Sequence, residues 1–402
     1  MKKILIFSLN YYPKFIGGAE VAIKEITDRI LPQDYTFDVV TLRFDSSLPE
    51  VEKIGNVTVY RIGFTKENPT IADLKKFPLH LNKSLYQFTA FSKASELHLK
   101  NHYDAIWAMM AHSCAVPAGL FKQKYPEVKY LLTLQEGDPI PYIKRKMFPV
   151  YPLFVKGFRL ADGMQTISTY LAKWGRDMGF KGLLEVVPNA VNTKYFSQTY
   201  PPQELSALKD KLGKKEGDIY LITTSRLVPK NAVDDVIKSL ALLPDYIHFL
   251  ILGIGPDEAK LRALAKNSGV ESRVKFLGQV DHKEMPLYLK VSDIFIRPSL
   301  SEGMGNSFVE AMAAELPVIA TQEGGIADFL FDPEINKDKK PTGRAVKPKD
   351  PKGIAEAVQK FIHDTVATKA IVANAKELVF AKYDWDLIAK TMKEKVFDRL
   401  FL

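Results

Sequence analysis

Two cations follow directly on an apolar run in the second half of the chain. Arg226 and Lys230 come after Ile219 to Thr224, a run with the length and composition of a buried strand. Open parallel sheets bind their ligands at the carboxyl ends of their strands. A planar guanidinium and a compact ammonium, four residues apart, can both reach one diphosphate. The spacing is compatible with phosphate binding, and a solvated loop explains it equally well.

Residues 297–313 join an expected strand to an expected helix through a glycine-containing turn. A helix that begins near Asn306 would direct its free N–H groups and the positive end of its dipole at a phosphate. Glu302 precedes this helix, and Glu310 lies about one turn inside it. Because carboxylates accept hydrogen bonds from paired hydroxyls, the two glutamates suit one sugar ring and one ribose. A capped surface helix would explain Asn306 but neither the glycines nor the second glutamate.

Gly253 and Gly255 end another expected strand. Glycines allow tight turns there and a close approach of the backbone beside a ligand. A dinucleotide-binding fingerprint requires a third glycine where this sequence has Glu258, and no G-x-x-x-x-G-K-[ST] loop occurs. The sequence therefore argues against an NAD site and excludes a phosphate-binding loop of that second type.

Short apolar runs alternate with longer amphipathic stretches in two successive series, as in parallel sheets with crossover helices. A chain of 402 residues exceeds one ordinary core of roughly 250–300 residues, so each series predicts its own α/β domain. The expected strands are Ile4 to Phe7, Phe37 to Thr41, Val57 to Ile62, Ala105 to Met109, Tyr130 to Leu134, Gly163 to Ile167 and Glu185 to Val187, then Ile219 to Thr223, His248 to Leu252, Val274 to Leu277, Ile294 to Ile296 and Pro317 to Ala320.

The adjacent prolines Pro201 and Pro202 favour a linker over residues 195–205, which sets the domain boundary near residue 195. The last segment carries apolar residues at three-to-four-residue spacing and predicts an amphipathic helix that needs a partner surface. The expected organisation is an N-terminal Rossmann-like domain (1–194), a C-terminal Rossmann-like domain (195–384) and a final helix (385–402).

Several motifs together resemble those of glycosyltransferase family 4, the retaining enzymes of two-domain GT-B fold, over nearly the whole chain. The resemblance rests on Arg226 with Lys230, on the glutamates eight residues apart, and on four short segments. These segments are Gly17-Gly18-Ala19-Glu20, Val187-Pro188-Asn189-Ala190-Val191-Asn192, Pro317-Val318-Ile319-Ala320 and Gly324-Gly325.

The resemblance implies two Rossmann-like domains that face each other across a cleft, with the final helix returning to the N-terminal domain. It implies Arg226 and Lys230 on the donor diphosphate, Glu310 on the ribose and Glu302 at the donor sugar. The expected donor-binding set is Gly17, Gly18, Arg226, Lys230, Gly253, Glu302, Gly303, Met304, Gly305, Asn306, Ser307 and Glu310.

The sequence departs from the family near the reacting carbon. Many members carry a histidine after the strand Tyr130 to Leu134, where this chain has Gln135. Glu136, Asp138 and His112 are the other candidates for the polar group near that carbon. For His112, a structural hydrogen bond is the alternative. The expected catalytic set is therefore Glu302, Arg226, Lys230, His112 and Asp138. The family's lysine-glycine is here Lys230-Asn231, and its asparagine-glycine is Asn189-Ala190.

Composition sets the class of protein and its surroundings. With 46% apolar and 26% charged residues the chain should fold throughout. Its single cysteine, Cys114, excludes a disulfide framework and is expected in a core. The N-terminal apolar run is too short for a signal peptide, and no membrane-spanning segment is visible. We therefore expect a cytoplasmic protein.

The positive charge is concentrated in the first half of the chain. Residues 1–200 hold 26 Lys and Arg against 18 Asp and Glu, which is +8 of the total +9. With cations beside aromatic residues at 75–91 and 144–148, this bias suggests a weak contact with an anionic membrane surface. A solvated basic surface is the alternative, and no motif suggests nucleic acid.

Taken together, the sequence predicts transfer of a hexosyl unit from a nucleoside diphosphate sugar to a glycan or lipid-linked hydroxyl. Retention of configuration follows from the resemblance, and no metal or other cofactor is expected, because cations and the helix N-terminus can stabilise the leaving diphosphate. Two alternatives stay open: a sugar-nucleotide-binding protein without activity, and an epimerase or phosphorylase of the same architecture.

Overall fold

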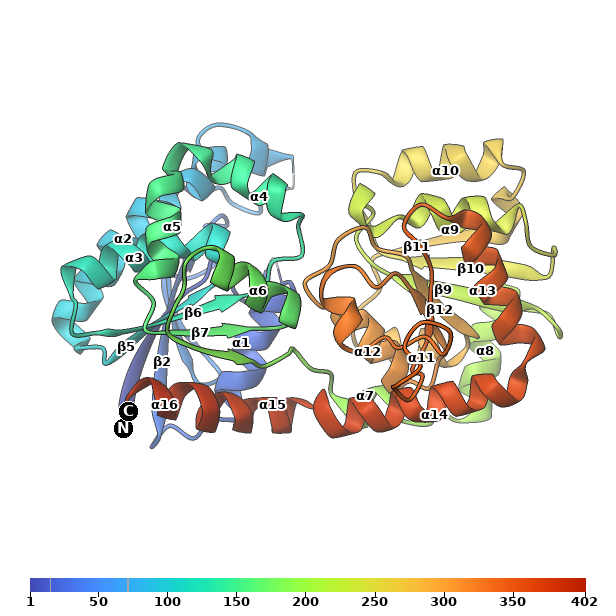
Figure 1. Cartoon of the computed structure of the whole chain (residues 1–402). Coiled ribbons are helices and arrows are strands. Elements are labelled where there is room, and N and C mark those ends of the chain that lie inside the picture. Colours follow the sequence, from blue (N-terminus) through green and yellow to red (C-terminus); the bar gives the residue numbers. More distant parts are fainter. Residues whose placement is uncertain (15, 71) are drawn as a thin grey trace. The chain divides into compact units, whose positions relative to one another are not determined.

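The computed structural model describes residues 1–14, 16–70 and 72–402, and Figure 1 labels their elements. The chain forms two compact units. Unit 1 comprises residues 1–189 and 385–402, and unit 2 comprises residues 190–384. The chain passes from unit 1 to unit 2 after Asn189, a few residues before the boundary that the prolines suggest.

Unit 1 is built on an eight-stranded sheet of order β3-β4-β2-β1-β5-β6-β7-β8. All neighbouring strands run parallel except the pair β3 and β4. The chain winds one way from β1 to β2 and the other way from β5 to β8, so the topological switch point lies between β1 and β5. The strands are β1 (Lys2–Phe7), β2 (Tyr35–Leu42), β3 (Val51–Ile54), β4 (Val57–Ile62), β5 (Ala105–Met109), β6 (Lys129–Leu134), β7 (Gly163–Thr166) and β8 (Leu183–Val186).

Helices cover both faces of this sheet (Figure 1). On one face α3 packs against both α2 and α5, and on the other α1 packs against the C-terminal helix α15. Strand β5 is buried along its whole length, as expected for a central strand covered on both sides. The helices are α1 (Gly18–Asp28), α2 (Asn82–Asn101), α3 (Ala111–Lys124), α4 (Ile140–Met147), α5 (Tyr151–Arg159) and α6 (Thr169–Asp177).

Unit 2 is built on a six-stranded parallel sheet of order β11-β10-β9-β12-β13-β14. The winding direction reverses between β9 and β12, which places the switch point of this sheet there. Leu221, Phe249, Ile251 and Ile296 are fully buried in its core. The strands are β9 (Ile219–Thr224), β10 (Ile247–Leu252), β11 (Val274–Gly278), β12 (Ile294–Arg297), β13 (Val318–Ala320) and β14 (Arg344–Ala345).

The helices of unit 2 correct one prediction. Pro201 and Pro202 do not mark an extended linker, since Pro201 is the N-cap of α8 and Pro202 its first residue. Proline is tolerated there because the first-turn N–H groups have no intrahelical partner. The helices are α7 (Thr193–Phe196), α8 (Pro202–Leu212), α9 (Val233–Leu240), α10 (Glu258–Asn267), α11 (Met285–Lys290), α12 (Asn306–Ala313), α13 (Pro351–His363) and α14 (Thr365–Lys382).

The C-terminal segment packs on the N-terminal sheet, as its apolar spacing requires. It comprises α15 (Trp385–Thr391), a π-helical turn at Met392–Phe397 and α16 (Asp398–Leu400). Phe397 lies 5.2 Å from the ring of Trp107 on β5, centroid to centroid. The hydroxyl of Tyr35 on β2 donates to Asp398 at 2.7 Å. The predicted two-sheet α/β fold with a final helix on the N-terminal domain is confirmed.

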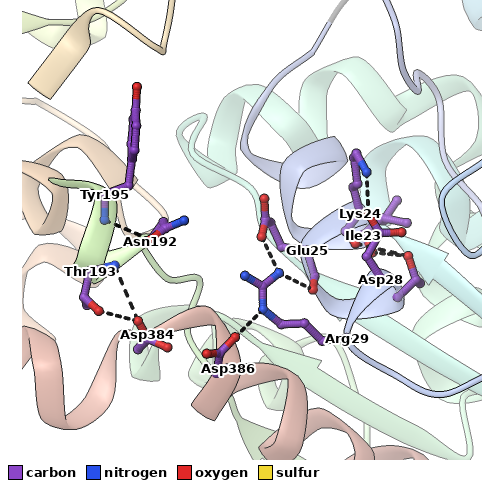
Figure 2. A network of polar contacts seen from close by, with 11 residues as sticks. Ile23, Lys24, Glu25, Asp28, Arg29, Asn192, Thr193, Tyr195, Asp384 and Asp386 are labelled. Carbon is purple, nitrogen blue, oxygen red and sulfur yellow. Dashed lines mark hydrogen bonds and ion pairs between the residues drawn. The ribbon is translucent and has the colours of Figure 1, made fainter.

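Different side chains hold the chain on either side of its return to unit 1 (Figure 2). In unit 2, Asp384 accepts hydrogen bonds from the hydroxyl and the backbone N–H of Thr193. In unit 1, Asp386 accepts from Nε of Arg29 at 2.6 Å. None of the helices in the described ranges has the length and apolarity needed to cross a bilayer.

Candidate active site

The cations of unit 2 and its glycine-rich turn meet at the switch point of the sheet. Arg226 and Lys230 lie in the loop after β9, and Glu302 lies in the loop after β12. The backbone N–H of Leu300 donates to the carbonyl of Lys230 at 2.7 Å, which joins the two loops. The side chain of Arg226 is exposed and that of Lys230 is half-buried. In α/β sheets a switch point of this kind is the usual place for a ligand.

The glycines after β10 support the cationic loop. A Cβ on Gly253 would lie 1.9 Å from the carbonyl oxygen of Ser225, and one on Gly255 would lie 2.2 Å from that of Leu227. Gly253 also has φ +148°, which side chains rarely adopt. The N–H groups of Ser225 and Leu227 donate to this part of the chain at 3.0 Å each. The glycines therefore bring the loop with Arg226 against β10.

Helix α12 begins at Asn306, as the sequence predicts. Its N-cap is Gly305 with φ +88°, a residue that has no side chain to cap the first turn. The backbone N–H groups of this turn can therefore bind an anion, aided by the helix dipole. The side chain of Met304 is buried, so this residue anchors the turn in the core and can offer a ligand only its backbone.

Arg297, at the end of β12, holds the turn before α12 through hydrogen bonds to two of its side chains. Its Nη1 donates to the hydroxyl of Ser307 and its Nη2 to Glu302, both at 2.8 Å, and its guanidinium lies 4.3 Å from the ring centroid of Phe308. Burial lowers the pKa of Arg297, and the carboxylates of Glu302 and Glu310 act against this. No motif in the sequence assigns this role to Arg297.

A second glycine turn fixes the backbone of Glu302. The N–H of Gly325 donates to the Glu302 carbonyl at 3.0 Å. A Cβ on Gly324 would lie 2.0 Å from that oxygen, and Gly324 has φ +63°. Arg297 thus holds the side chains of the turn before α12, and residues 324–325 hold the backbone of the same turn.

Glu310 has a partner that the sequence did not suggest. Its Oε1 lies 3.2 Å from Nε2 of His282, whose side chain is 66% exposed against 15% for Glu310. The His282 ring packs on Phe196 with a centroid distance of 5.3 Å. Because His282 lies in an exposed loop without a motif, no sequence signal pointed to it.

Unit 1 places its candidate residues at the carboxyl edge of its own sheet. Gly17 is the N-cap of α1, Gly18 is the first residue of α1, and the N–H of Gly17 donates to buried Glu20 at 2.7 Å. Desolvation raises the pKa of Glu20, although the backbone hydrogen bonds it accepts act in the opposite direction. Asp138 lies half-buried in the loop before α4.

Gln135, which replaces the family histidine, and His112 differ in how accessible their side chains are to a ligand. Gln135 exchanges two hydrogen bonds of 3.1 Å with the amide of Asn189 and is buried. His112 lies in the first turn of α3, beside Glu136, and its side chain is 15% exposed.

Cys114 is fully buried, as expected, and burial raises the pKa of its thiol. Within 1–14, 16–70 and 72–402, no three His, Cys, Asp or Glu side chains are grouped as metal ligands.

Comparison with known proteins identifies the family. Residues 16–195 match the model described as Glycosyltransferase Family 4, and residues 206–378 match the model described as Glycosyl transferases group 1. An uncharacterized glycosyltransferase of Methanocaldococcus jannaschii is 24% identical over 409 residues, which cover 96% of each chain.

A second relative is similar over part of its length. The GDP-mannose-dependent monoacylated alpha-(1-6)-phosphatidylinositol monomannoside mannosyltransferase of Corynebacterium glutamicum is 30% identical over 58% of this chain and 61% of its own. In fold, sucrose-phosphate synthase of Thermosynechococcus elongatus matches with a TM-score of 0.81 at 20% identity, over 100% of this chain and 99% of that one. With both family models matched and the two-sheet architecture in place, the chain belongs to glycosyltransferase family 4 and has the GT-B fold.

Proposed function

We propose that this glycosyltransferase moves a hexosyl unit from a nucleoside diphosphate sugar to a hydroxyl of a glycan or lipid-linked acceptor, with retention and without a metal ion. The observation that carries the proposal is the turn before α12. Arg297 holds Glu302 and Ser307 there, and Leu300 ties the same loop to Lys230. One anion site thus has cations, a helix N-terminus and a carboxylate around it.

Each group of the site has a task in this reaction. Arg226 and Lys230 bind the diphosphate together with the first-turn N–H groups of α12. Glu302 accepts hydrogen bonds from the donor sugar, and Glu310 accepts from the ribose. In unit 1, Gly18 can offer its backbone N–H to a phosphate oxygen, whereas the N–H of Gly17 is donated to Glu20.

The proposed chemical step is a substitution at the anomeric carbon. The acceptor oxygen forms a bond to that carbon while the bond to the phosphate oxygen breaks. The acceptor proton passes to the departing diphosphate, attack occurs on the face from which the diphosphate leaves, and configuration is retained. Lys230 and the α12 N-terminus stabilise the charge that develops on the leaving group, so a divalent ion is not required.

The donor and acceptor classes rest on the relatives. The name of the C. glutamicum relative gives GDP-mannose as its donor and a phosphatidylinositol mannoside as its acceptor. We extend only the classes to this chain: a nucleoside diphosphate sugar, and an acceptor that is a glycan or carries a lipid.

A lipid-linked acceptor fits one surface of unit 1. Phe77 and Phe148 are 80% and 79% exposed, and cations precede both in the sequence. Burial, and after it the charge of Lys146 on α4, lower the pKa of Lys83 on α2. We name residues 75–91 and 144–148 the basic aromatic surface and propose that it contacts anionic lipid weakly, at the inner face of a membrane.

The test is a panel of UDP-, GDP- and ADP-sugars incubated with the purified protein in EDTA, with release of nucleoside diphosphate followed. Release from one donor and a glycoside product of retained configuration would support the proposal. Tight nucleotide binding without turnover would favour an inactive sugar-nucleotide-binding protein. An epimerised donor, or a sugar phosphate made with inorganic phosphate, would favour the other two alternatives.

A further inference from the structure

The position of the family histidine is closed to substrate in this chain. Gln135 and Asn189 are 9% and 4% exposed, and their two amides satisfy each other through a pair of 3.1 Å hydrogen bonds. A buried amide that already donates one hydrogen bond and accepts another inside the protein has little left to offer a ligand. If unit 1 supplies a polar group near the reacting carbon, that group must come from a neighbouring position.

His112 is such a group, and the sheet places it at the right edge. Strand β5 pairs with β6 in register, with Met109 opposite Thr133, so His112 and Glu136 each follow three residues beyond a paired position. Strand β5 also borders β1 at the switch point, where ligands of such sheets bind. The backbone before the helix is strained, since Met110 has φ +69°, and strain of this kind is common at functional sites.

Glu136 holds His112 in place. Its Oε1 accepts the backbone N–H of His112 at 3.1 Å and lies 3.4 Å from Nδ1 of the same residue. Its Oε2 accepts the N–H of Gln135 at 3.0 Å. The Glu136 side chain is 1% exposed, so it cannot reach a substrate itself, whereas that of His112 is 15% exposed. The carboxylate of Glu136 also caps α3, whose N-cap Met110 makes no side-chain hydrogen bond.

We propose that Glu136 is a positioning residue that fixes the Nδ1–H tautomer of His112, and that this pair takes over the role of the missing family histidine. With Nδ1–H directed at the carboxylate, Nε2 carries the lone pair and accepts a hydrogen bond from a substrate hydroxyl. The inference rests on the proposed function for the identity of the substrate. The tautomer itself is independent of any donor or acceptor.

The first measurement is the tautomer. Long-range ¹⁵N–¹H spectra of histidine-labelled protein separate the two tautomers, and His112→Asn identifies the resonances of His112. The wild type is expected to show Nδ1–H. Glu136→Gln keeps the shape of the side chain but replaces one oxygen by an amide group, which shifts His112 towards Nε2–H when that group faces Nδ1. A wild-type Nε2–H tautomer would overturn the inference, whether or not the enzyme turns over the tested donors.

The second measurement compares two replacements of the imidazole. Asn at position 112 places its amide near Nδ1 and keeps the contact with Glu136, whereas Gln places its amide near Nε2. If Nε2 binds a substrate hydroxyl, His112→Gln keeps more activity than His112→Asn, which loses roughly tenfold in kcat/KM, the worth of about one such hydrogen bond. Glu136→Gln should lower activity without changing nucleoside diphosphate affinity.

The double variant Glu136→Gln/His112→Asn separates a shared role from two unrelated ones. Because Glu136 acts through His112, the double variant should be no less active than His112→Asn alone. Multiplicative losses, or equal activity of the Asn and Gln variants, would contradict the proposal. A wild type that turns over no donor would refute the proposed function while the tautomer test still stands.

Discussion

The backbone N–H of Leu300 donates to the carbonyl of Lys230 at 2.7 Å, so the loops after β9 and β12 form one continuous site wall. Asn231, where many family members have glycine, reinforces this wall, since its amide donates to the carbonyl of Arg226 at 2.7 Å. The departure from the family pattern thus adds a hydrogen bond within the cationic loop. These two loops depend on supporting contacts that single substitutions can remove.

Gly253→Ala should disrupt the cationic loop. Its new Cβ would meet the Ser225 carbonyl at 1.9 Å, where only the backbone can give way. Nucleoside diphosphate affinity should fall, measured by calorimetry. The matched control is Gly269→Ala, which also has positive φ but nothing within 4 Å of the added carbon. It should cost about 1 kcal/mol of stability and leave affinity unchanged. Equal affinities in the two variants would refute the supporting role of Gly253.

Arg297→Met should destabilise the protein by about 3–5 kcal/mol, because Glu302 is left as a largely buried carboxylate without its partner. Urea unfolding measures the loss. Adding Glu302→Gln removes the unpaired charge and should restore part of the stability, but not the activity, since Glu302 serves the donor sugar. A double variant as unstable as Arg297→Met would show that the ion pair is not what holds the turn.

The architecture could be predicted because most strands are visible in the sequence as short apolar or alternating runs. Val57 to Ile62 and Ala105 to Met109 were placed with the bounds that the structure shows, and α12 begins at the predicted Asn306. Strand β3 was missed, because its alternating residues Val51 to Ile54 are exposed or half-buried at a sheet edge. The prolines at 201–202 favour a linker in the sequence but begin α8 in the structure, because adjacent prolines occur both before helices and in coil.

The site could be predicted only as far as short motifs reach. Arg226, Lys230, Glu302 and Glu310 were singled out because they follow strands or a glycine turn. The partners of these residues lie elsewhere in the chain: His282 is 28 residues from Glu310, and Glu136 is 24 residues from His112. Only the folded sheet brings such pairs together, and a single sequence carries no signal for them. The roles of the predicted site residues are still predictions.

Glu20 should make the free energy of unfolding depend on pH. Desolvation raises the pKa of Glu20 in the folded state, so the folded protein binds more protons than the unfolded chain between the two pKa values. Stability is therefore lost as pH rises through this window, from about 4.3 in the unfolded chain up to the raised value. Glu20→Gln keeps an acceptor for Gly17 and does not ionise. Urea unfolding from pH 4 to 8 should show the variant gaining on the wild type; a constant difference would contradict this.

The basic aromatic surface should bind anionic vesicles in a salt-sensitive way. Lys144→Ala/Lys146→Ala should weaken partitioning into phosphatidylglycerol vesicles roughly tenfold or more, at about 1 kcal/mol per cation near the surface. The exposed lysines Lys209 and Lys211 of α8 provide the control pair, whose removal should have little effect. Equal retention on neutral and anionic vesicles at low salt, measured by flotation, would remove the proposed contact.

We propose that a nucleoside diphosphate sugar is bound and cleaved at the β9–β12 switch point. The most direct test is nucleoside diphosphate release from the preferred donor by the wild type, Lys230→Ala and Lys266→Ala. Lys266 is exposed at the end of α10 and serves as the charge control. Lys230→Ala should lose about a hundredfold or more in kcat, as for removal of one group that stabilises developing charge. Lys266→Ala should match the wild type. Full activity in Lys230→Ala would contradict the claim.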